Sequence, residues 1–309
     1  MKKREQIKLK EYWGLVWIIP ALALVSIFML YPIISAFAHS FTNWDGGMIS
    51  DFIFMDNYRE VLSDSLFWIS MMNVVILTVV GMIIGNTASI FLAELMFNLK
   101  GGRLTSVYRF LFVLPAMIPG IVVLLLWQKL ILSGSSTGVL NMILSGFGIS
   151  PSEWFNSSNT AVVFLSIFLY GFPWMGGTSF LIYLAGFNNI SQEVIEAAKL
   201  DGISTFGRVF KIDLPLIRGQ IKYFLVFGFI QGLQNYTMQY AITSGAPGEI
   251  INDMQSGTMV PGFYIYQLIY GSSRMGAYGY ACTIGVVMFV IILAITLINN
   301  KFFKTDEAL

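Results

Sequence analysis

Apolar residues along this chain gather into blocks that are separated by polar stretches. A bilayer core of about 30 Å needs roughly 20 apolar residues in a helix. Six blocks reach that length, at 13–38, 68–97, 107–131, 160–186, 220–243 and 278–300. The chain is 56% hydrophobic and 11% charged, whereas soluble domains carry about 25% charged residues. The pattern therefore predicts an all-α membrane protein with six transmembrane helices.

Basic residues are distributed unevenly between the loops that join these blocks. With both termini on one side, that side holds 15 of the 18 Lys and Arg residues, and the other holds Arg59, Lys129 and Arg274. Cytoplasmic loops carry an excess of Lys and Arg, so both termini are predicted to be cytoplasmic. The expected divisions are a cytoplasmic N-terminal segment, a transmembrane domain and a cytoplasmic tail, at 1–12, 13–300 and 301–309.

The sequence gives no indication of catalytic or metal chemistry. The dipeptide Gly-Lys does not occur, which excludes a phosphate-binding P-loop. His39 and Cys282 are single residues of their kinds, too few for an ordinary metal site. The net charge of +1 gives no reason to expect nucleic-acid binding. The chain is therefore predicted to be no enzyme and to bind no cofactor or metal itself.

One acidic residue stands within an apolar block, near its predicted cytoplasmic end. Carriers driven by ion gradients commonly place such a group inside the membrane. Glu94 is the candidate here, and Lys100 and Arg103 follow it in the chain. A carboxylate paired with these basic residues at the interface is the favoured interpretation, and a proton relay in a secondary carrier is the alternative.

The loop at 190–219 is long, polar and predicted to lie on the cytoplasmic side. Ser191 is a suitable N-cap for a first short helix. Gly202 suits the left-handed position that ends such a helix. Ser204 or Thr205 can then cap a second helical piece. The expected result is a helix–turn–helix element at the membrane surface.

Small side chains on the first of these helices would allow close approach by another molecule. Ala197 and Ala198 remove bulk, and Glu196 places a carboxylate beside them. Pro215 is expected to start the next membrane helix, because its missing N–H costs little there. The residues alone leave two interpretations open, a docking element for a soluble partner and an ordinary amphipathic surface helix.

The spacing of the fixed residues in this loop resembles the EAA motif of binding-protein-dependent ABC permeases. The motif reads Glu-Ala-Ala, three residues, Gly, nine residues, Ile, one residue and Leu-Pro. The matching positions are Glu196, Ala197, Ala198, Gly202, Ile212, Leu214 and Pro215. In that family the loop is a coupling helix seated in a groove of a cytoplasmic ATPase. The resemblance implies a type I importer fold and ATPase coupling through these residues and Asp201.

Other segments resemble the sugar-permease branch of the same family. They are 109–141, 184–190 and 243–247, the last with Ala246 where that branch has Gly. The resemblance implies a first-of-pair subunit of the maltose or glycerol-phosphate type in a bacterial cell membrane. It also implies a second permease chain, two ATPase subunits that use ATP and Mg²⁺, and an extracytoplasmic sugar-binding protein.

The fifth apolar block carries amide side chains that are costly in lipid unless they face protein or water. Gln231, Gln234 and Asn235 are spaced to share one face of a helix. A cavity lined by this face is the favoured interpretation. Gly228 and Gly232 leave close helix packing open as the alternative.

The resemblance to the maltose-type permeases implies substrate contacts in the same region, with different residue types. The candidate substrate-binding residues are Gly171, Trp174, Gly228, Gln231, Gly232, Gln234 and Asn235. Amides can bond sugar hydroxyls, and aromatic faces can pack on a sugar ring. A carbohydrate, and in particular an oligosaccharide, is the predicted substrate. Glycerol phosphate or another small polar solute, and a stand-alone secondary sugar carrier, remain as alternatives.

Overall fold

The computed structural model describes residues 17–48, 50–99, 102–174, 177–271 and 277–302. The chain divides into two compact units, one formed by residues 1–64 with 265–290 and the other by residues 65–264 with 291–309. The predicted N-terminal segment 1–12 and nearly all of the predicted tail lie outside the described residues. Each unit is considered separately.

The first unit contains the first predicted span as one apolar helical run, Ile19–His39, of 21 residues. A π-helical turn interrupts its α-helical hydrogen bonding. This unit also holds a short helix after the span and parts of two helices from late in the chain. Its elements are α2 (Ile19–Val25), η1 (Ser26–Leu30), α3 (Tyr31–His39), α4 (Asp56–Ser63), the end of α15 (Pro261–Tyr270) and the start of α16 (Tyr278–Phe302).

Buried polar contacts fasten the loop after the first span to the start of α16. The Thr283 hydroxyl donates to the Ser40 carbonyl at 2.9 Å, and the Tyr280 hydroxyl donates to the Asp64 carboxylate at 2.7 Å. Gly279 is required by close packing, since a Cβ there would lie 2.1 Å from the Thr42 carbonyl oxygen. Polar groups of this loop therefore stabilise the unit alongside its apolar contacts.

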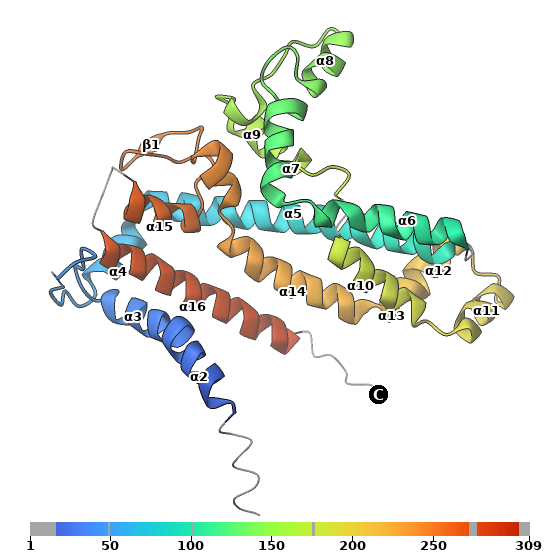
Figure 1. Cartoon of the computed structure of the whole chain (residues 1–309), viewed down its shortest axis with the longest axis horizontal. Coiled ribbons are helices and arrows are strands. Elements are labelled where there is room, and N and C mark those ends of the chain that lie inside the picture. The colour runs from blue at the N-terminus through green and yellow to red at the C-terminus, as the bar shows by residue number, and fades with distance from the viewer. Residues whose placement is uncertain (1–16, 49, 100–101, 175–176, 272–276, 303–309) are drawn as a thin grey trace, which may run out of the picture. The chain divides into compact units, whose positions relative to one another are not determined.

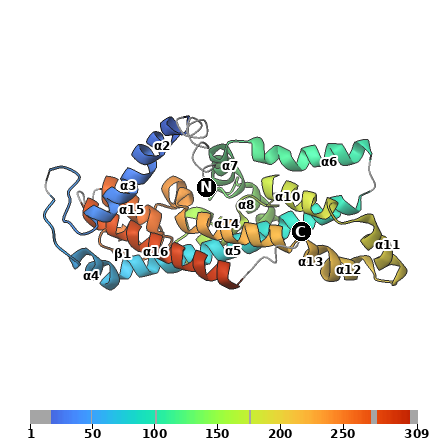
Figure 2. The same ribbon diagram turned by 90° about the horizontal axis from the view of Figure 1, so that it is seen from below.

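The second unit is built on one long helix, α5 (Ser65–Asn98), of 34 residues. Two other helices, α10 (Gly177–Asn188) and α14 (Arg218–Gln234), pack along it (Figure 2). Their shared core includes Phe180, Tyr183 and Phe187, each almost without solvent exposure. This packing orients the polar residues of α5 relative to those of α10 and α14.

The third predicted span is not a straight helix. Its two parts, Thr105–Met117 and Gly120–Ile131, meet at an angle of 88°. Pro119 explains the break, because a residue before proline is driven out of the α region, and Ile118 has an extended ψ of 130°. The elements concerned are α6 (Arg103–Val113), η2 (Leu114–Met117), α7 (Gly120–Leu126) and η3 (Trp127–Ile131).

The fourth and fifth predicted spans are also divided. The fourth consists of α9 (Thr160–Leu169) and α10, separated by a break that includes Gly171 and Pro173. The fifth consists of α14 and η6 (Gln239–Thr243), separated at Asn235. The described residues thus hold three uninterrupted helices long enough to span a membrane, or four if the bent pair is one span. Six continuous membrane helices are not observed in this part of the chain.

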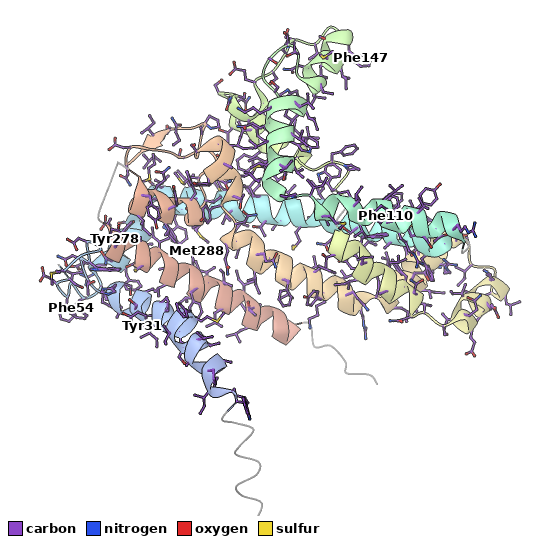
Figure 3. The ribbon with its side chains drawn as sticks, viewed as in Figure 1. Tyr31, Phe54, Phe110, Phe147, Tyr278 and Met288 are labelled. Atoms are coloured by element: carbon purple, nitrogen blue, oxygen red, sulfur yellow. The ribbon has the colours of Figure 1, made fainter. Side chains whose placement is uncertain are left out.

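An arm formed by α7, α8 (Val139–Gly146), η4 (Trp154–Asn156) and α9 starts beside α5 and projects away from it toward α8 (Figure 1). Its base is a small core of Leu132, Trp154 and Phe155. Phe147 lies at the end of the arm with 79% of its surface exposed (Figure 3). A short hairpin of β1 (Ile250–Ile251) and β2 (Met254–Gln255) completes the unit.

Candidate functional site

Two neighbouring cavities of about 400 and 390 Å³ lie beside the middle of α5. They share four wall residues, Leu77 and Thr78 of α5 and Gly232 and Asn235 at the end of α14. At Gly232 a Cβ would lie 2.6 Å from the Thr78 hydroxyl oxygen, so glycine is required for α14 to approach α5. The close contact between α5 and α14 therefore lies in the wall that the two cavities share.

The first cavity has a mostly apolar wall with a few polar side chains. Tyr170 follows α9, Gln239 begins η6, and Ile121 and Leu124 come from α7. Gln239 is almost completely buried, which is the setting in which an amide needs a partner. The π-helical turn of η6 thus places the Gln239 amide in the cavity wall. The amides expected there were Gln231, Gln234 and Asn235, on one continuous fifth helix.

The second cavity is more polar, and its polar groups are linked by hydrogen bonds. Asn86 of α5 accepts a bond of 2.6 Å from the Tyr183 hydroxyl. Ser89 of α5 and Ser179 of α10 lie 2.8 Å apart, hydroxyl to hydroxyl. Asn86, Ser89 and Ser179 line the cavity together with Trp174. The wall therefore presents neutral donors and acceptors with one indole ring.

The structure brings most of the predicted substrate residues to these cavities. Trp174, Gly228 and Gln231 line the second cavity, and Gly232 and Asn235 line both. Gly171 and Gln234 are not among the residues that line either one. The role of these residues in binding remains a prediction, and the two that lie outside the walls are the weakest candidates.

The prediction that Gln231, Gln234 and Asn235 share one face of a helix is wrong for Asn235. Helix α14 ends at Gln234, and Asn235 is extended with φ −81° and ψ 129°. The Asn235 side-chain oxygen instead accepts a bond of 2.9 Å from the Thr237 backbone N–H. Asparagine competes with the helix for backbone hydrogen bonds in this way, which explains why the span breaks here.

The polar residues that α5 contributes to the cavities were not among the predicted site residues. Thr78, Asn86 and Ser89 stand in a mostly apolar helix and line the second cavity. Their separations of eight and three residues place them on one face of an α-helix. Counting polar residues by helical face within the second apolar block would have revealed them.

The loop at 190–219, which we call the docking loop after its predicted role, follows the prediction closely at its turn. Helix α11 (Gln192–Leu200) ends with Gly202 in the left-handed region at φ +70°. The Ile203 N–H donates to the Ala198 carbonyl and the Gly202 N–H to the Lys199 carbonyl, which is a Schellman C-cap. The Ser204 hydroxyl accepts from the Gly207 N–H and caps α12 (Thr205–Arg208).

Three details of the loop differ from the prediction. Ser191 occupies the N-cap position of α11, but its side chain makes no capping bond. Pro215 lies within the short α13 (Leu214–Leu216) after the π-turn η5 (Val209–Asp213), and the next long helix begins at Arg218. Ala198 is buried inside the chain with 3% exposure. Of the two alanines expected to allow close approach by another molecule, only Ala197 is therefore on the surface.

The surface of the loop combines exposed apolar side chains with two acidic residues. Leu200 is 89% exposed and Phe206 is 75% exposed, and the ring of Phe206 packs on that of Phe210 at 4.9 Å. Glu196 and Asp201 are also exposed. Exposed apolar clusters of this kind mark surfaces that bind protein or membrane. The loop, which contains α11 and α12, lies at one end of the second unit (Figures 1 and 2).

Glu94 has a different partner from the basic residues named by sequence analysis. Its carboxylate lies 3.6 Å from the Arg208 guanidinium, whereas Arg103 is exposed and Lys100 lies outside the described residues. Glu94 is not among the residues that line either cavity. It is therefore a buried charge at the docking loop.

Comparison with known proteins places these features in a family. The family described as "Binding-protein-dependent transport system inner membrane component" matches residues 85–304. The probable ABC transporter permease protein YesP of Bacillus subtilis is 31% identical over 99% of this chain and 94% of its own length. The arabinooligosaccharides transport system permease protein AraP of the same organism is 31% identical over 89% of this chain and 83% of its own length.

The fold is likewise shared with a known structure. A chain in the crystal structure of a bacterial ABC transporter involved in the import of the acidic polysaccharide alginate superposes with a TM-score of 0.80. The match covers 97% of this chain and 98% of that chain at 22% identity. The present chain therefore belongs to the inner membrane components of binding-protein-dependent transport systems, within the permeases of ABC sugar importers.

Proposed function

We propose that this chain forms half of the translocation pathway of an ATP-driven importer for an oligosaccharide in a bacterial cytoplasmic membrane. A second permease chain supplies the other half, and an extracytoplasmic binding protein delivers the sugar. Two cytoplasmic ATPase subunits use ATP and Mg²⁺, and the loop at 190–219 is the element through which this chain docks on them. In this scheme the chain itself needs no bound cofactor, and both of its termini are cytoplasmic.

The composition of the cavity walls is the observation that carries the choice of substrate. Among the described residues, the lining side chains are apolar, amide, hydroxyl or aromatic, without a charged group. Neutral amides and hydroxyls suit sugar hydroxyls, and the Trp174 ring suits the apolar face of a sugar. A phosphate group would need a cation or a cluster of N–H donors. Glycerol phosphate is therefore the weaker alternative.

The relatives support the choice of a sugar and of an oligosaccharide in particular. AraP of Bacillus subtilis is named for arabinooligosaccharides. LacF of Rhizobium radiobacter, which is 28% identical over 99% of this chain, is named for lactose. These names describe those proteins, and their agreement on saccharides favours a saccharide here.

The exposed surface of the docking loop supports an ATPase partner. Leu200, Phe206 and Phe210 would be costly to expose to water, and Glu196 lies on the same short helix as Leu200. An ATPase that closes on ATP would bind this surface more tightly in one conformation of the permease than in another. That difference in affinity is what drives a switch between inward- and outward-facing cavities.

Co-purification from the native host tests the proposal. The tagged chain in detergent is expected to bring with it an ATPase and a second permease that carries the EAA spacing. Deleting the chain should abolish uptake of one saccharide, and the full chain should restore it. The rate of uptake in intact cells is expected to depend on the cellular ATP concentration. It should be unchanged by a protonophore when ATP is maintained. A chain that purifies alone, with uptake that collapses under the protonophore, would establish a secondary carrier instead.

A further inference from the structure

A buried charged cluster joins the docking loop to the end of α5. The Arg208 Nε donates to the Asp213 carboxylate at 2.9 Å, and Arg208 Nη2 lies 3.6 Å from the Glu94 carboxylate. All three side chains are at most 10% exposed. The Arg59–Asp56 ion pair, by contrast, is largely exposed. The cluster is thus a buried ionic contact within the described residues.

Three residues of α5 hold the Arg208 guanidinium. Besides Glu94, the Asn98 side-chain oxygen accepts a bond from Arg208 Nη2, and the guanidinium carbon lies 5.7 Å from the centre of the Phe97 ring. Asn98 also donates to Glu94 at 2.6 Å. A guanidinium has donors in a fixed planar arrangement, so these contacts fix the position of Arg208 against α5.

The backbone between Arg208 and Asp213 is shaped for this contact. Residues Val209–Asp213 form a π-helical turn, in which the Leu214 N–H donates to the Val209 carbonyl. The i to i+5 spacing of that bond brings residues five apart onto one side, and Arg208 and Asp213 are five apart. Pro215 follows directly and has no N–H to continue regular helical bonding. π-turns within helices occur often at functional sites.

Helix α5 connects this cluster to the cavities. It is one continuous helix from Ser65 to Asn98, and it lines both cavities at Thr78. At about 1.5 Å per residue, Thr78 and Glu94 are roughly 24 Å apart along the helix axis. A displacement of Arg208 therefore acts on the helix that forms the cavity wall.

The cluster holds more carboxyl oxygens than its one guanidinium can pair, which argues against a role in stability alone. Two carboxylates face one guanidinium, and in the described structure Glu94 Oε2 and Asp213 Oδ1 are buried without a hydrogen-bond partner. Buried ion pairs contribute little net stability compared with well-packed apolar residues, because both ions lose their hydration. A cluster with unpaired oxygens stabilises the fold less still.

We propose that Arg208 is a positioning residue that links the ATPase-docking loop to α5, so that movement of the loop is passed to the cavity wall. This inference rests on the proposed function in one respect, the binding of an ATPase by the loop. The proposal requires that the Arg208 guanidinium contact Glu94 and Asn98 of α5 while it also binds Asp213.

The test uses the complete importer in proteoliposomes, with ATP hydrolysis and sugar uptake measured in the same vesicles. An apolar replacement of the cluster, Glu94→Leu/Arg208→Met/Asp213→Leu, removes the charges while keeping volume in the core. We expect this variant to assemble and hydrolyse ATP, with at least a tenfold fall in sugar imported per ATP. A normal ratio would overturn the proposal. Arg59→Met, which removes an exposed ion pair, is the matched control and should leave the ratio unchanged.

A milder variant keeps the test decisive if the triple replacement does not assemble. Asn98 is exposed, so Asn98→Ala should fold while removing one acceptor from Arg208. We expect a two- to fivefold fall in sugar per ATP for Asn98→Ala and a larger fall for Arg208→Lys, which keeps the charge but loses the fork. Unchanged ratios in both variants would overturn the positioning role. Failure of the unmodified chain to bind any ATPase would instead remove the proposed function.

Discussion

The Tyr183 hydroxyl of α10 donates a hydrogen bond of 2.6 Å to the side-chain oxygen of Asn86 on α5. Tyr183 is fully buried in the core of the second unit, whereas Asn86 lines the second cavity. The amide nitrogen of Asn86 donates to the Met82 carbonyl at 2.8 Å. Both ends of this amide are therefore held, and its orientation toward the cavity is determined by the core.

Tyr183→Phe is expected to loosen this amide while leaving the aromatic packing in place. Loss of one such bond costs about 1 kcal/mol of unfolding free energy, and the thermal midpoint of the purified protein in detergent should fall. The apparent KM for the sugar should rise, since Asn86 is no longer oriented. Tyr223→Phe, at a half-exposed ring, is the control. Equal effects of the two substitutions would contradict the argument.

Gly232→Ala is expected to force α14 and α5 apart. The new Cβ would lie 2.5 Å from the Thr78 methyl carbon, whereas a Cβ at Gly228 would lie 3.5 Å from Met82 in ordinary contact. Overpacking of this kind costs about 1–3 kcal/mol. Uptake and thermal midpoint should fall for Gly232→Ala, and the thermal midpoint should stay near normal for Gly228→Ala. Partial recovery in Gly232→Ala/Thr78→Ala would identify the clash as the cause.

Asn141→Ala is expected to unfold the base of the arm locally. The fully buried side chain donates to the carbonyls of Ser133, Ser135 and Ser152, and its oxygen accepts from the Trp154 indole at 3.0 Å. Leaving these groups unpaired costs roughly 2–4 kcal/mol. Limited proteolysis should cut between 133 and 156 faster than in the unmodified chain. The exposed Asn156→Ala should not change the rate.

Glu196→Lys is expected to preserve insertion of the chain and to separate ATP hydrolysis from transport. It reverses a charge on the exposed helix of the docking loop, where Gln192 is its hydrogen-bonding neighbour at 3.2 Å. Sugar uptake should fall by at least tenfold in vesicles that still hydrolyse ATP. Glu153→Lys makes the same charge change on an exposed residue of the arm. Normal uptake by Glu196→Lys would rule out the docking role.

Local signals in the sequence predicted the docking loop well. Gly202 and Ser204 act through their own backbone and near neighbours, so short-range rules place the turn and the second cap. The break at Gly171 and Pro173 follows from the same kind of rule. Hydropathy, by contrast, averages over many residues and cannot register the bend at Pro119 or the helix end at Gln234.

Contacts between distant segments could not be predicted from one sequence. Arg208 is one of several basic residues in a polar loop, and its partners Glu94 and Asn98 lie more than a hundred residues earlier. The pairing depends on α5 reaching the loop, which depends in turn on how α10 and α14 pack. Thr78 and Asn86, by contrast, share a helical face that the sequence itself shows, and only their place in the cavity walls depends on this packing.

The early end of α14 has a consequence for how sugar preference can change. The last four carbonyls of a helix have no intrahelical partners, and α14 ends beside Asn235, a residue of both cavity walls. The Gly232 carbonyl accepts the Asn235 N–H, and the other main-chain oxygens of this last turn are acceptors that no side-chain substitution removes. Under the proposed function, these oxygens would bind sugar hydroxyls whatever the wall side chains are. The preferred saccharide could then change through exchange of wall side chains alone.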